Sequence, residues 1–216
     1  HLLSWIVIAA VGVWGVWRLI IYIKNRYFIS QLHYQPMVEK LPVDFKGLFG
    51  ATPLMGAARC ATDVSEIKRI LAQGANPNQH DRAGNTALML AVRYNPNVEV
   101  IQALIQAGAD TFVRSDDNET LLGITARYNT NPAVVTVLIA AGGDVNAADN
   151  FGRTPLMRAA QSNPNPAVVM ALLEAGADKT LRSKEGKRAA DYAHENVEIY
   201  KTEAFYALDP DKAPME

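Results

Sequence analysis

The sequence predicts an all-α solenoid of stacked helix pairs that follows one transmembrane helix. Three observations predict this fold class. First, AVRYNPN at residues 91–97 returns in similar form at 125–131 and 159–165, each time after 34 residues. Second, a threonine and a glycine recur with the same period, which is typical of repeat architectures. Third, residues 2–23 contain a single charged side chain, as a membrane-spanning helix requires.

The apolar run at residues 2–23 is long enough to cross a membrane. As an α-helix its 22 residues would extend over about 33 Å, and a bilayer core is about 30 Å thick. Aromatic side chains near both ends suit the membrane–water interface, and an arginine near one end can extend its charge to the headgroups. A signal peptide is the alternative, but the run exceeds the usual apolar region and no A-x-A site follows. The expected membrane-interface residues are Trp5, Trp14, Trp17, Arg18 and Tyr22.

Positive charges cluster at the C-terminal end of the apolar run, at Arg18, Lys24 and Arg26. The positive-inside rule therefore predicts that the downstream domain lies in the cytoplasm. Positive residues upstream of His1 would reverse this expectation, so a periplasmic domain is the alternative. The expected segments are a transmembrane helix at residues 1–23 and a juxtamembrane helix and linker at residues 24–46.

Threonine and glycine divide the rest of the chain into similar units. The marker threonines are spaced by 34 residues, and a glycine follows each of them after 22 residues. The threonine is placed as the N-cap of a first helix, where its hydroxyl accepts a first-turn N–H. The glycine is placed directly after a second helix, which a left-handed residue ends. The threonines are Thr52, Thr86, Thr120 and Thr154, and the glycines are Gly74, Gly108, Gly142 and Gly176.

Each unit is predicted to be a helix pair. Pro53 and Pro155 follow their threonines at the first helical position, which tolerates proline. Asparagine and proline end the first helix in a turn such as YNPN, and a second helix with apolar residues three and four apart follows. A β-like turn such as DNFGRT leads to the next unit. Asn118 replaces its glycine in the third unit, and asparagine tolerates positive φ better than other non-glycine residues.

The motifs TPLMRAA, VVMALLEAGAD and DNFGRTPLM resemble ankyrin repeats. The resemblance implies helix-turn-helix repeats with β-hairpin-like turns, and it extends over residues 47–196. Residues 194–208 resemble a capping helix after a degenerate last repeat, and the loop style NPNPAVV resembles bacterial ankyrin proteins. The units are expected at 47–80, 81–114, 115–148 and 149–182, with a partial unit at 183–196 and a C-terminal cap and tail at 197–216.

Two features depart from the ankyrin consensus. The period is 34 residues, where the consensus has about 33, and the extra residue is placed in the turn between the two helices. The usual histidine of the TPLH motif is also replaced, so a hydrogen-bonding group is lost and the contact between repeats is expected to be more apolar. The replacing residues are Met55, Met89, Gly123 and Met157.

The chain shows no motif that predicts catalysis, a cofactor or a metal site. It lacks a nucleophile elbow, a P-loop, a dinucleotide fingerprint and a CxxC pair, and His194–Glu195 lacks the second histidine of a zinc-binding helix. Residues 47–216 carry 16 basic and 20 acidic side chains, which disfavours nucleic acid as a partner. We therefore expect neither an enzyme nor a protein that binds a small-molecule substrate.

Arginine and tyrosine recur near the end of the first helix. Arg59, Arg93 and Arg127 stand seven residues after their threonines, and Tyr94 and Tyr128 directly follow the last two. The resemblance to ankyrin repeats implies that this column lines the binding groove. Arginine and tyrosine are enriched at interface hot spots, and arginines suit an acidic helix or a loop with carboxylates. The alternative is that each arginine only caps the carbonyls of its own helix.

The turns between units form a second candidate surface. Phe151 is the most distinctive residue there, because an aromatic side chain at an exposed tip can anchor a partner. The alternative is that it folds back on the neighbouring repeat. The candidate partner-binding residues at these tips are Arg82, Asp116, Asp117, Phe151 and Arg153.

These features together predict a membrane-anchored protein–protein interaction module. It would act as a scaffold or as an accessory subunit of a larger, multi-subunit membrane complex, with the helix at residues 2–23 in the inner or plasma membrane. A periplasmic, membrane-tethered ankyrin protein that supports another enzyme is the alternative.

Overall fold

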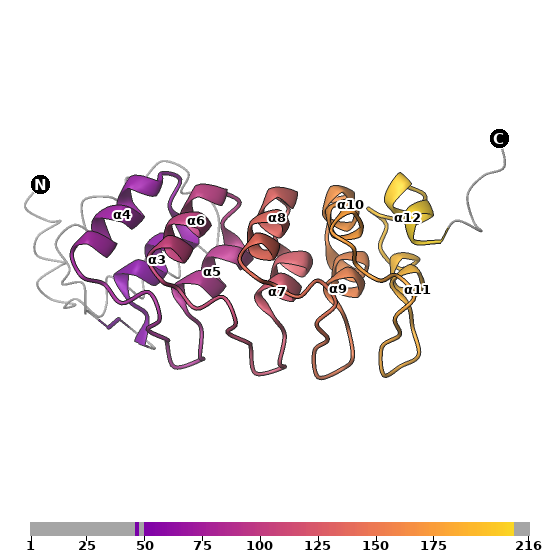
Figure 1. The fold of residues 1–216 in the computed structure, drawn as a ribbon, viewed down its shortest axis with the longest axis horizontal. Coiled ribbons are helices and arrows are strands. Elements are labelled where there is room, and N and C mark those ends of the chain that lie inside the picture. The colour runs from indigo at the N-terminus through magenta and orange to yellow at the C-terminus, as the bar shows by residue number, and fades with distance from the viewer. Residues whose placement is uncertain (1–45, 48–49, 210–216) are drawn as a thin grey trace, which may run out of the picture.

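The computed structural model describes residues 46, 47 and 50–209 of the chain. The predicted transmembrane helix, its interface residues and nearly all of the juxtamembrane segment lie outside this part. No helix among the described residues is long and apolar enough to span a bilayer. The described residues instead form an elongated stack of helix pairs, which runs from residue 50 at one end to residue 209 at the other (Figure 1).

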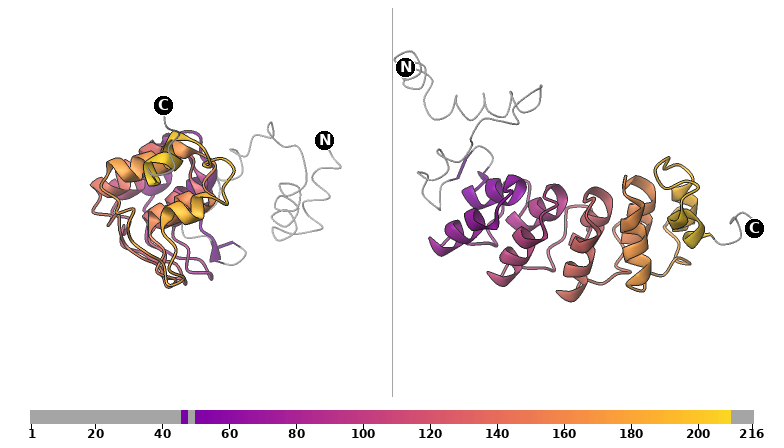
Figure 2. Two further views of the ribbon diagram at one scale, coloured as in Figure 1. Left: turned by 90° about the vertical axis from the view of Figure 1, so that its right-hand side faces the viewer. Right: turned by 90° about the horizontal axis from the view of Figure 1, so that it is seen from above.

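The helices form two rows, and each helix pair contributes one helix to each row (Figure 2). Loops extend from the first row on the side away from the second row (Figure 1). The first row consists of α3 (Pro53–Cys60), α5 (Ala87–Tyr94), α7 (Leu121–Tyr128), α9 (Pro155–Ser162) and α11 (Ala189–Ala193). The second row consists of α4 (Val64–Ala72), α6 (Val98–Gln106), α8 (Pro132–Ala140), α10 (Pro166–Glu174) and α12 (Glu203–Leu208).

The marker threonines are the N-caps of the first-row helices, which confirms the prediction. Each threonine hydroxyl accepts a hydrogen bond from the backbone N–H three residues later, for example from Met89 to Thr86 at 3.2 Å. At the first unit, the sulfur of Met55 also accepts from the backbone N–H of Thr52, at 3.3 Å. The expected loss of a hydrogen-bonding group is therefore wrong at Met55, where a weak sulfur acceptor completes the cap.

Left-handed residues occur where the sequence predicts them. The glycines after the second-row helices have φ values from 83° to 93°. Asn118 has a φ of 60° in the turn where Gly84 and Gly152 have 75° and 73°. The first group ends the second-row helices, and the second group forms the turns before the next first-row helices, so that every unit starts in the same orientation.

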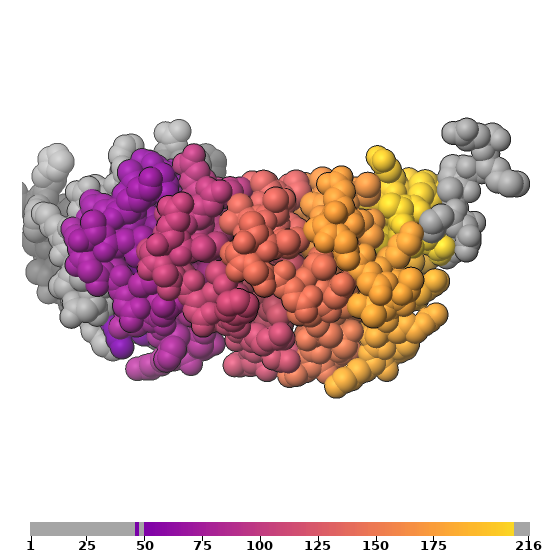
Figure 3. Space-filling model, viewed as in Figure 1, coloured from indigo at the N-terminus to yellow at the C-terminus, as the bar shows by residue number. Residues whose placement is uncertain are grey.

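The core lies between the two rows. The first row contributes alanines that are completely buried, including Ala58, Ala91, Ala126 and Ala160. Such small side chains let neighbouring first-row helices pack closely, and larger residues of the second row fill the remaining space. Successive units are in direct contact along the whole array (Figure 3). The large second-row residues that are at most 2% exposed include Ile67, Ile101, Leu104, Leu138 and Leu172.

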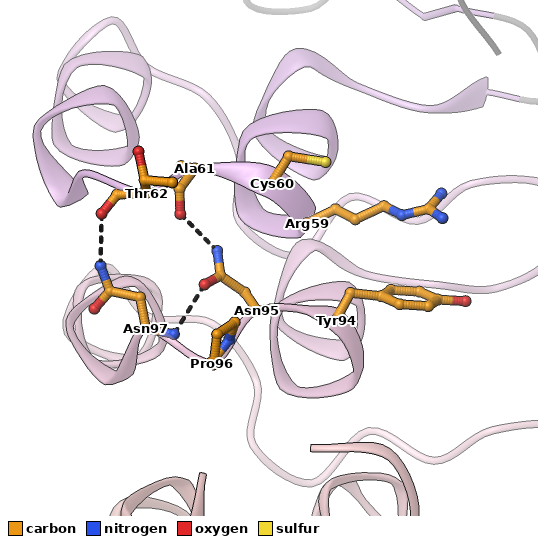
Figure 4. A pocket seen from close by; sticks show the side chains of 8 residues that line it. All are labelled: Arg59, Cys60, Ala61, Thr62, Tyr94, Asn95, Pro96 and Asn97. Carbon is orange, nitrogen blue, oxygen red and sulfur yellow. Dashed lines mark hydrogen bonds between the residues drawn. The ribbon is translucent and has the colours of Figure 1, made fainter. Parts of the chain in front are cut away.

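A column of buried asparagines joins each unit to the one before it. The side-chain Nδ2 of Asn95 donates to the carbonyl of Ala58 at 3.0 Å. It also donates to the carbonyl of Ala61 at 2.9 Å, and the Oδ1 of Asn95 accepts from the backbone N–H of Asn97 (Figure 4). The same three bonds recur in each following unit. We call this column the asparagine ladder, and it consists of Asn95, Asn129, Asn163 and Asn196, which are at most 9% exposed.

A second asparagine, two residues later, strengthens the same joint. Asn97, Asn131 and Asn165 are the N-caps of α6, α8 and α10. Each also donates its side-chain N–H to a carbonyl of the preceding unit, at 2.7 to 3.0 Å. The recurring NPN and NTN segments are therefore needed both to start the second helix and to fasten it to the previous repeat.

The prediction of a capping helix over residues 194–208 is wrong in the length of the helix. Residues 194–202 form turns around the buried Asn196, and α12 begins only at Glu203. Lys201 has a φ of 62°, which an α-helix does not allow. Thr202 then caps the new helix by accepting from the backbone N–H of Phe205.

The asparagine ladder yields a stability prediction. Replacing Asn129 by alanine should lower the free energy of unfolding by about 2–4 kcal/mol, because two buried carbonyls and one N–H lose their partner. Urea unfolding of the full chain in mild detergent, followed by circular dichroism, measures this loss. Asn150→Ala is the control, since Asn150 is exposed and should change stability by less than about 0.5 kcal/mol. Equal effects of the two substitutions would contradict the role of the ladder.

Candidate protein-interaction surface

The predicted arginines and tyrosines come together at the C-terminal ends of the first-row helices. Arg59 lies in the last turn of α3, Arg93 and Tyr94 end α5, and Arg127 and Tyr128 end α7. Because neighbouring units repeat the same position, stacking the units places these five side chains in one column. Tyr94 and Tyr128 are 45% and 36% exposed. We call this column the arginine–tyrosine ladder.

Guanidinium groups and aromatic rings alternate along the ladder. The Cζ of Arg59 lies 4.4 Å from the ring centroid of Tyr94, and that of Arg93 lies 4.2 Å from the ring of Tyr128 in the next unit. Each tyrosine is also close to the arginine of its own unit, at 5.3 Å for Arg93 and 4.9 Å for Arg127. These distances are within the range of cation–π attraction. Each ring therefore lies near two guanidinium groups, and these contacts restrict the conformations of the arginine side chains.

The arginines of the ladder form no salt bridge with an acidic side chain among the described residues. Each of them also lies in the last turn of its own helix, where a positive charge interacts favourably with the helix dipole. The Nε of Arg93 is buried and has no hydrogen-bond partner in the described part of the chain. A partner cannot reach this buried Nε, so the donors available for an external anion are the terminal nitrogens of the guanidinium groups.

Two hollows lie beside the ladder. The larger has a volume of about 510 Å³ and is lined by Arg59 and Tyr94 together with the asparagine turn at residues 95–97. Arg59 and Tyr94 extend in parallel from neighbouring helices at this hollow (Figure 4). The smaller, of about 200 Å³, lies on the side of the loops and is lined by Arg93, Arg127 and Tyr128 together with turn residues such as Ser115 and Asp117.

The ladder is confined to the first three units. In α9, the equivalent positions are Gln161 and Ser162, which carry neither a positive charge nor a ring. At the other end, Cys60 takes the position of the tyrosine. The charged and aromatic surface is therefore a short segment of the array.

The turn tips are exposed but linked to one another. Arg82, Asp116 and Asp117 are exposed side chains. The Asp117 carbonyl accepts from the backbone N–H of Asn150 at 3.0 Å, and the Phe151 carbonyl accepts from that of Lys184 at 3.0 Å. These backbone bonds align successive tips into a row that a partner can contact.

Phe151 keeps part of its ring at the surface. The side chain is 45% exposed, and the Cζ of Arg153 lies 4.4 Å from its ring centroid. Arg153 also forms a salt bridge with Asp149 at 3.3 Å, with only 16% of its side chain exposed. The two predicted contact residues therefore differ in accessibility. Phe151 can contact a partner, whereas Arg153 is mostly buried and packs against the ring of Phe151.

A buried charge cluster is the feature that sequence reasoning missed. Arg158 is 2% exposed and pairs with Glu119 at 3.0 Å through Nε and with Asp149 at 2.6 Å through a terminal nitrogen. The corresponding residues of the other units are Gly56, Leu90, Ile124 and Tyr192. An arginine at a position otherwise occupied by uncharged residues was the available signal.

Burial dominates the electrostatics of this cluster. Desolvation raises the pKa of Glu119 above its ordinary value, although the charge of Arg158 acts in the opposite direction and that of Arg127 also favours ionisation. Burial likewise opposes ionisation of Asp149, but hydrogen bonds from the backbone N–H groups of Arg153 and Phe151, together with Arg158, lower its pKa overall. Arg158 is therefore required to keep two buried carboxylates charged.

Comparison with known proteins supports the repeat assignment. A family model described as ankyrin repeats (3 copies) matches the chain over residues 19–115, 92–183 and 122–202. No curated protein matches the chain significantly. In the described part of the chain, no three histidine, cysteine, aspartate or glutamate side chains lie close enough together to hold a metal ion.

The charge cluster yields a pH-dependent prediction. Arg158→Leu should destabilise the fold by about 3–5 kcal/mol at pH 7, because two buried carboxylates lose their common partner. Without that charge their pKa values rise, so the folded variant takes up protons as the pH falls. The difference from the wild type should therefore narrow between pH 7 and pH 5. Urea unfolding at both pH values measures it, with the exposed Arg182→Leu as control, and a pH-independent difference would contradict the proposed ionisation.

Proposed function

Because this chain belongs to the ankyrin repeat family, we propose that it is a membrane-anchored protein–protein interaction module. It acts as a scaffold or as an accessory subunit of a larger membrane protein complex. Ankyrin repeats indicate an interaction module, and the observation that carries the proposal here is the arginine–tyrosine ladder. It presents three arginines that form no salt bridge among the described residues, together with half-exposed rings, on a stack of helices.

The ladder has the properties of an interface hot spot. Tyrosine and arginine are the residue types most enriched at such sites, and both contribute large contact areas. The rings also restrict the arginines before a partner binds, which lowers the entropy lost on binding. The half-exposed ring of Phe151 on the turn tips provides a second contact.

The membrane part of the proposal is supported by the sequence of residues 2–23. This run is apolar and long enough to cross a bilayer. Positive residues follow it, which favours a cytoplasmic repeat domain. A helix in the membrane and a repeat domain at its surface give the protein two places to contact a membrane complex, in the inner or plasma membrane.

Extraction of the full chain from native membranes with a mild detergent tests the proposed function. Mass spectrometry of the material that co-purifies should identify a membrane complex in a stoichiometric ratio. Absence of any protein partner, after extraction at several detergent concentrations, would overturn the role as a scaffold or accessory subunit.

Charge reversal in the ladder yields a prediction for partner capture. Arg93→Glu combined with Arg127→Glu should reduce the recovered partner about tenfold or more, because like charges then face the partner's acidic groups. Because Arg93 and Arg127 are only partly exposed, circular dichroism of the variant must show the same helix content as the wild type before the two captures are compared. Lys68→Glu combined with Lys184→Glu is the control, because it changes the net charge equally at exposed positions outside the ladder. Unchanged capture by the ladder variant would remove the ladder from the interface.

The side of the membrane yields a separate prediction. A reporter that is active only in the cytoplasm should be active when fused after residue 216, and a reporter that requires export should be inactive. The positive residues after the apolar run are the physical reason. The opposite pattern would favour the second candidate, a periplasmic ankyrin protein tethered to the membrane in support of another enzyme.

A further inference from the structure

The spacing of the ladder limits the shape of its partner. Arg59 and Arg93 contact the same ring of Tyr94 at 4.4 and 5.3 Å, so their guanidinium carbons cannot be more than about 10 Å apart. The two arginines occupy equivalent positions of adjacent units, and adjacent packed helices have axes about 8–10 Å apart. Because Arg59 and Arg93 reach the ring of the next unit at almost the same distance, 4.4 and 4.2 Å, the displacement between units also separates their charges, and anionic groups that engage both arginines must be about 8–10 Å apart.

A helix that lies along the array meets this spacing. Residues seven apart in an α-helix are on nearly the same face and are separated by about 10.5 Å. An extended chain does not fit, because side chains on the same face are about 6.6 or 13 Å apart. Residues four apart in a helix are only about 6 Å apart. The partner's carboxylates are therefore best placed at every seventh residue of a helix.

We propose that the arginine–tyrosine ladder binds an acidic amphipathic helix of a partner protein. Its glutamate or aspartate side chains, seven residues apart, each pair with one arginine. This inference rests on the proposed function and specifies the partner's chemistry. The guanidinium groups supply several donors each, and the carboxylates are the acceptors that match them in charge and shape.

The tyrosine rings restrict which residues of the partner helix can lie between its acidic residues. Tyr94 lies between Arg59 and Arg93, and Tyr128 lies between Arg93 and Arg127. On the bound helix, the residues three and four positions after each acid lie between successive acids on the same face. Apolar side chains at these positions would cover the exposed rings. The partner therefore has an acidic residue and an apolar pair in each heptad.

The two arginines at the start of the ladder are the stronger contacts. Arg127 and the buried Glu119 line the same smaller hollow, so part of the arginine's charge already has an interaction within the chain. No acidic residue among the described residues forms a salt bridge with Arg59 or Arg93. The bound helix should therefore depend most on its acids opposite Arg59 and Arg93.

Peptide binding tests the inference with the full chain in mild detergent. The probe is a fluorescent helical peptide with glutamates seven residues apart and leucines three and four residues after each. A peptide of identical composition, with glutamates five residues apart, distributes the acids around the helix. Fluorescence anisotropy should show the first peptide binding about tenfold or more tightly than the second. Equal affinities, or no binding of the first at about 1 mM, would overturn the proposal.

Substitutions locate the binding on the ladder. Arg59→Gln combined with Arg93→Gln should weaken binding about tenfold or more, and Tyr94→Leu about three- to tenfold. Tyr94→Phe keeps the ring and should stay within about twofold of the wild type. The control, Lys68→Gln combined with Lys184→Gln, removes the same charge elsewhere and should also stay within about twofold. A ladder variant that binds as tightly as the wild type would overturn the proposal.

Two further outcomes distinguish an acidic helix from a membrane surface or a partner of different shape. Anionic phosphatidylglycerol vesicles that bind through Arg59 and Arg93, while the peptide does not, would overturn the inference in favour of a membrane contact. Failure of the peptide to bind, with capture of the native partner intact, would overturn the helix assignment and leave the proposed function standing. Absence of any native partner would instead overturn the proposed function itself.

Discussion

The asparagine ladder sets the distance between neighbouring repeats, and the other features of the array depend on that distance. Each of its amides donates to two buried carbonyls of the preceding unit and accepts one N–H of its own. Buried polar groups without a partner are costly, so the units can stack only where all three bonds form. Hydrogen-bond geometry therefore determines how the units stack. Apolar burial also contributes, because the completely buried alanines allow neighbouring first-row helices to approach closely.

The arginine–tyrosine ladder is a consequence of this regular stacking. Arg59 reaches the ring of Tyr94, and Arg93 reaches that of Tyr128, only because each unit repeats the position of the last at a constant displacement. A cation–π contact holds each arginine in place without consuming its donors. The surface is thus ordered before a partner binds. Because the arginines are regularly spaced, the positions of the acidic groups on a partner are restricted as well.

The buried charge cluster departs from the repeat pattern. Arg158 stands where the other units have glycine, leucine, isoleucine or tyrosine, and it joins Glu119 to Asp149. A buried pair of this kind adds little net stability compared with apolar residues, but removing one partner is costly. Through Asp149 and Arg153 the cluster also supports the ring of Phe151 at the turn tip. Internal charges and the outer surface are therefore connected in this part of the array.

The sequence by itself determined the features that arise from local chain chemistry. Threonine caps, left-handed glycines and Asn118 depend on residues within one turn of each other, so their pattern predicts them directly. Only the tertiary structure decided which side chains meet across repeats. The two carbonyls reached by Asn129, the acids paired with Arg158 and the carbonyls reached by Asn196, around which the chain turns before α12, belong to this class. Such contacts join residues far apart in the chain, and stacking alone brings them together.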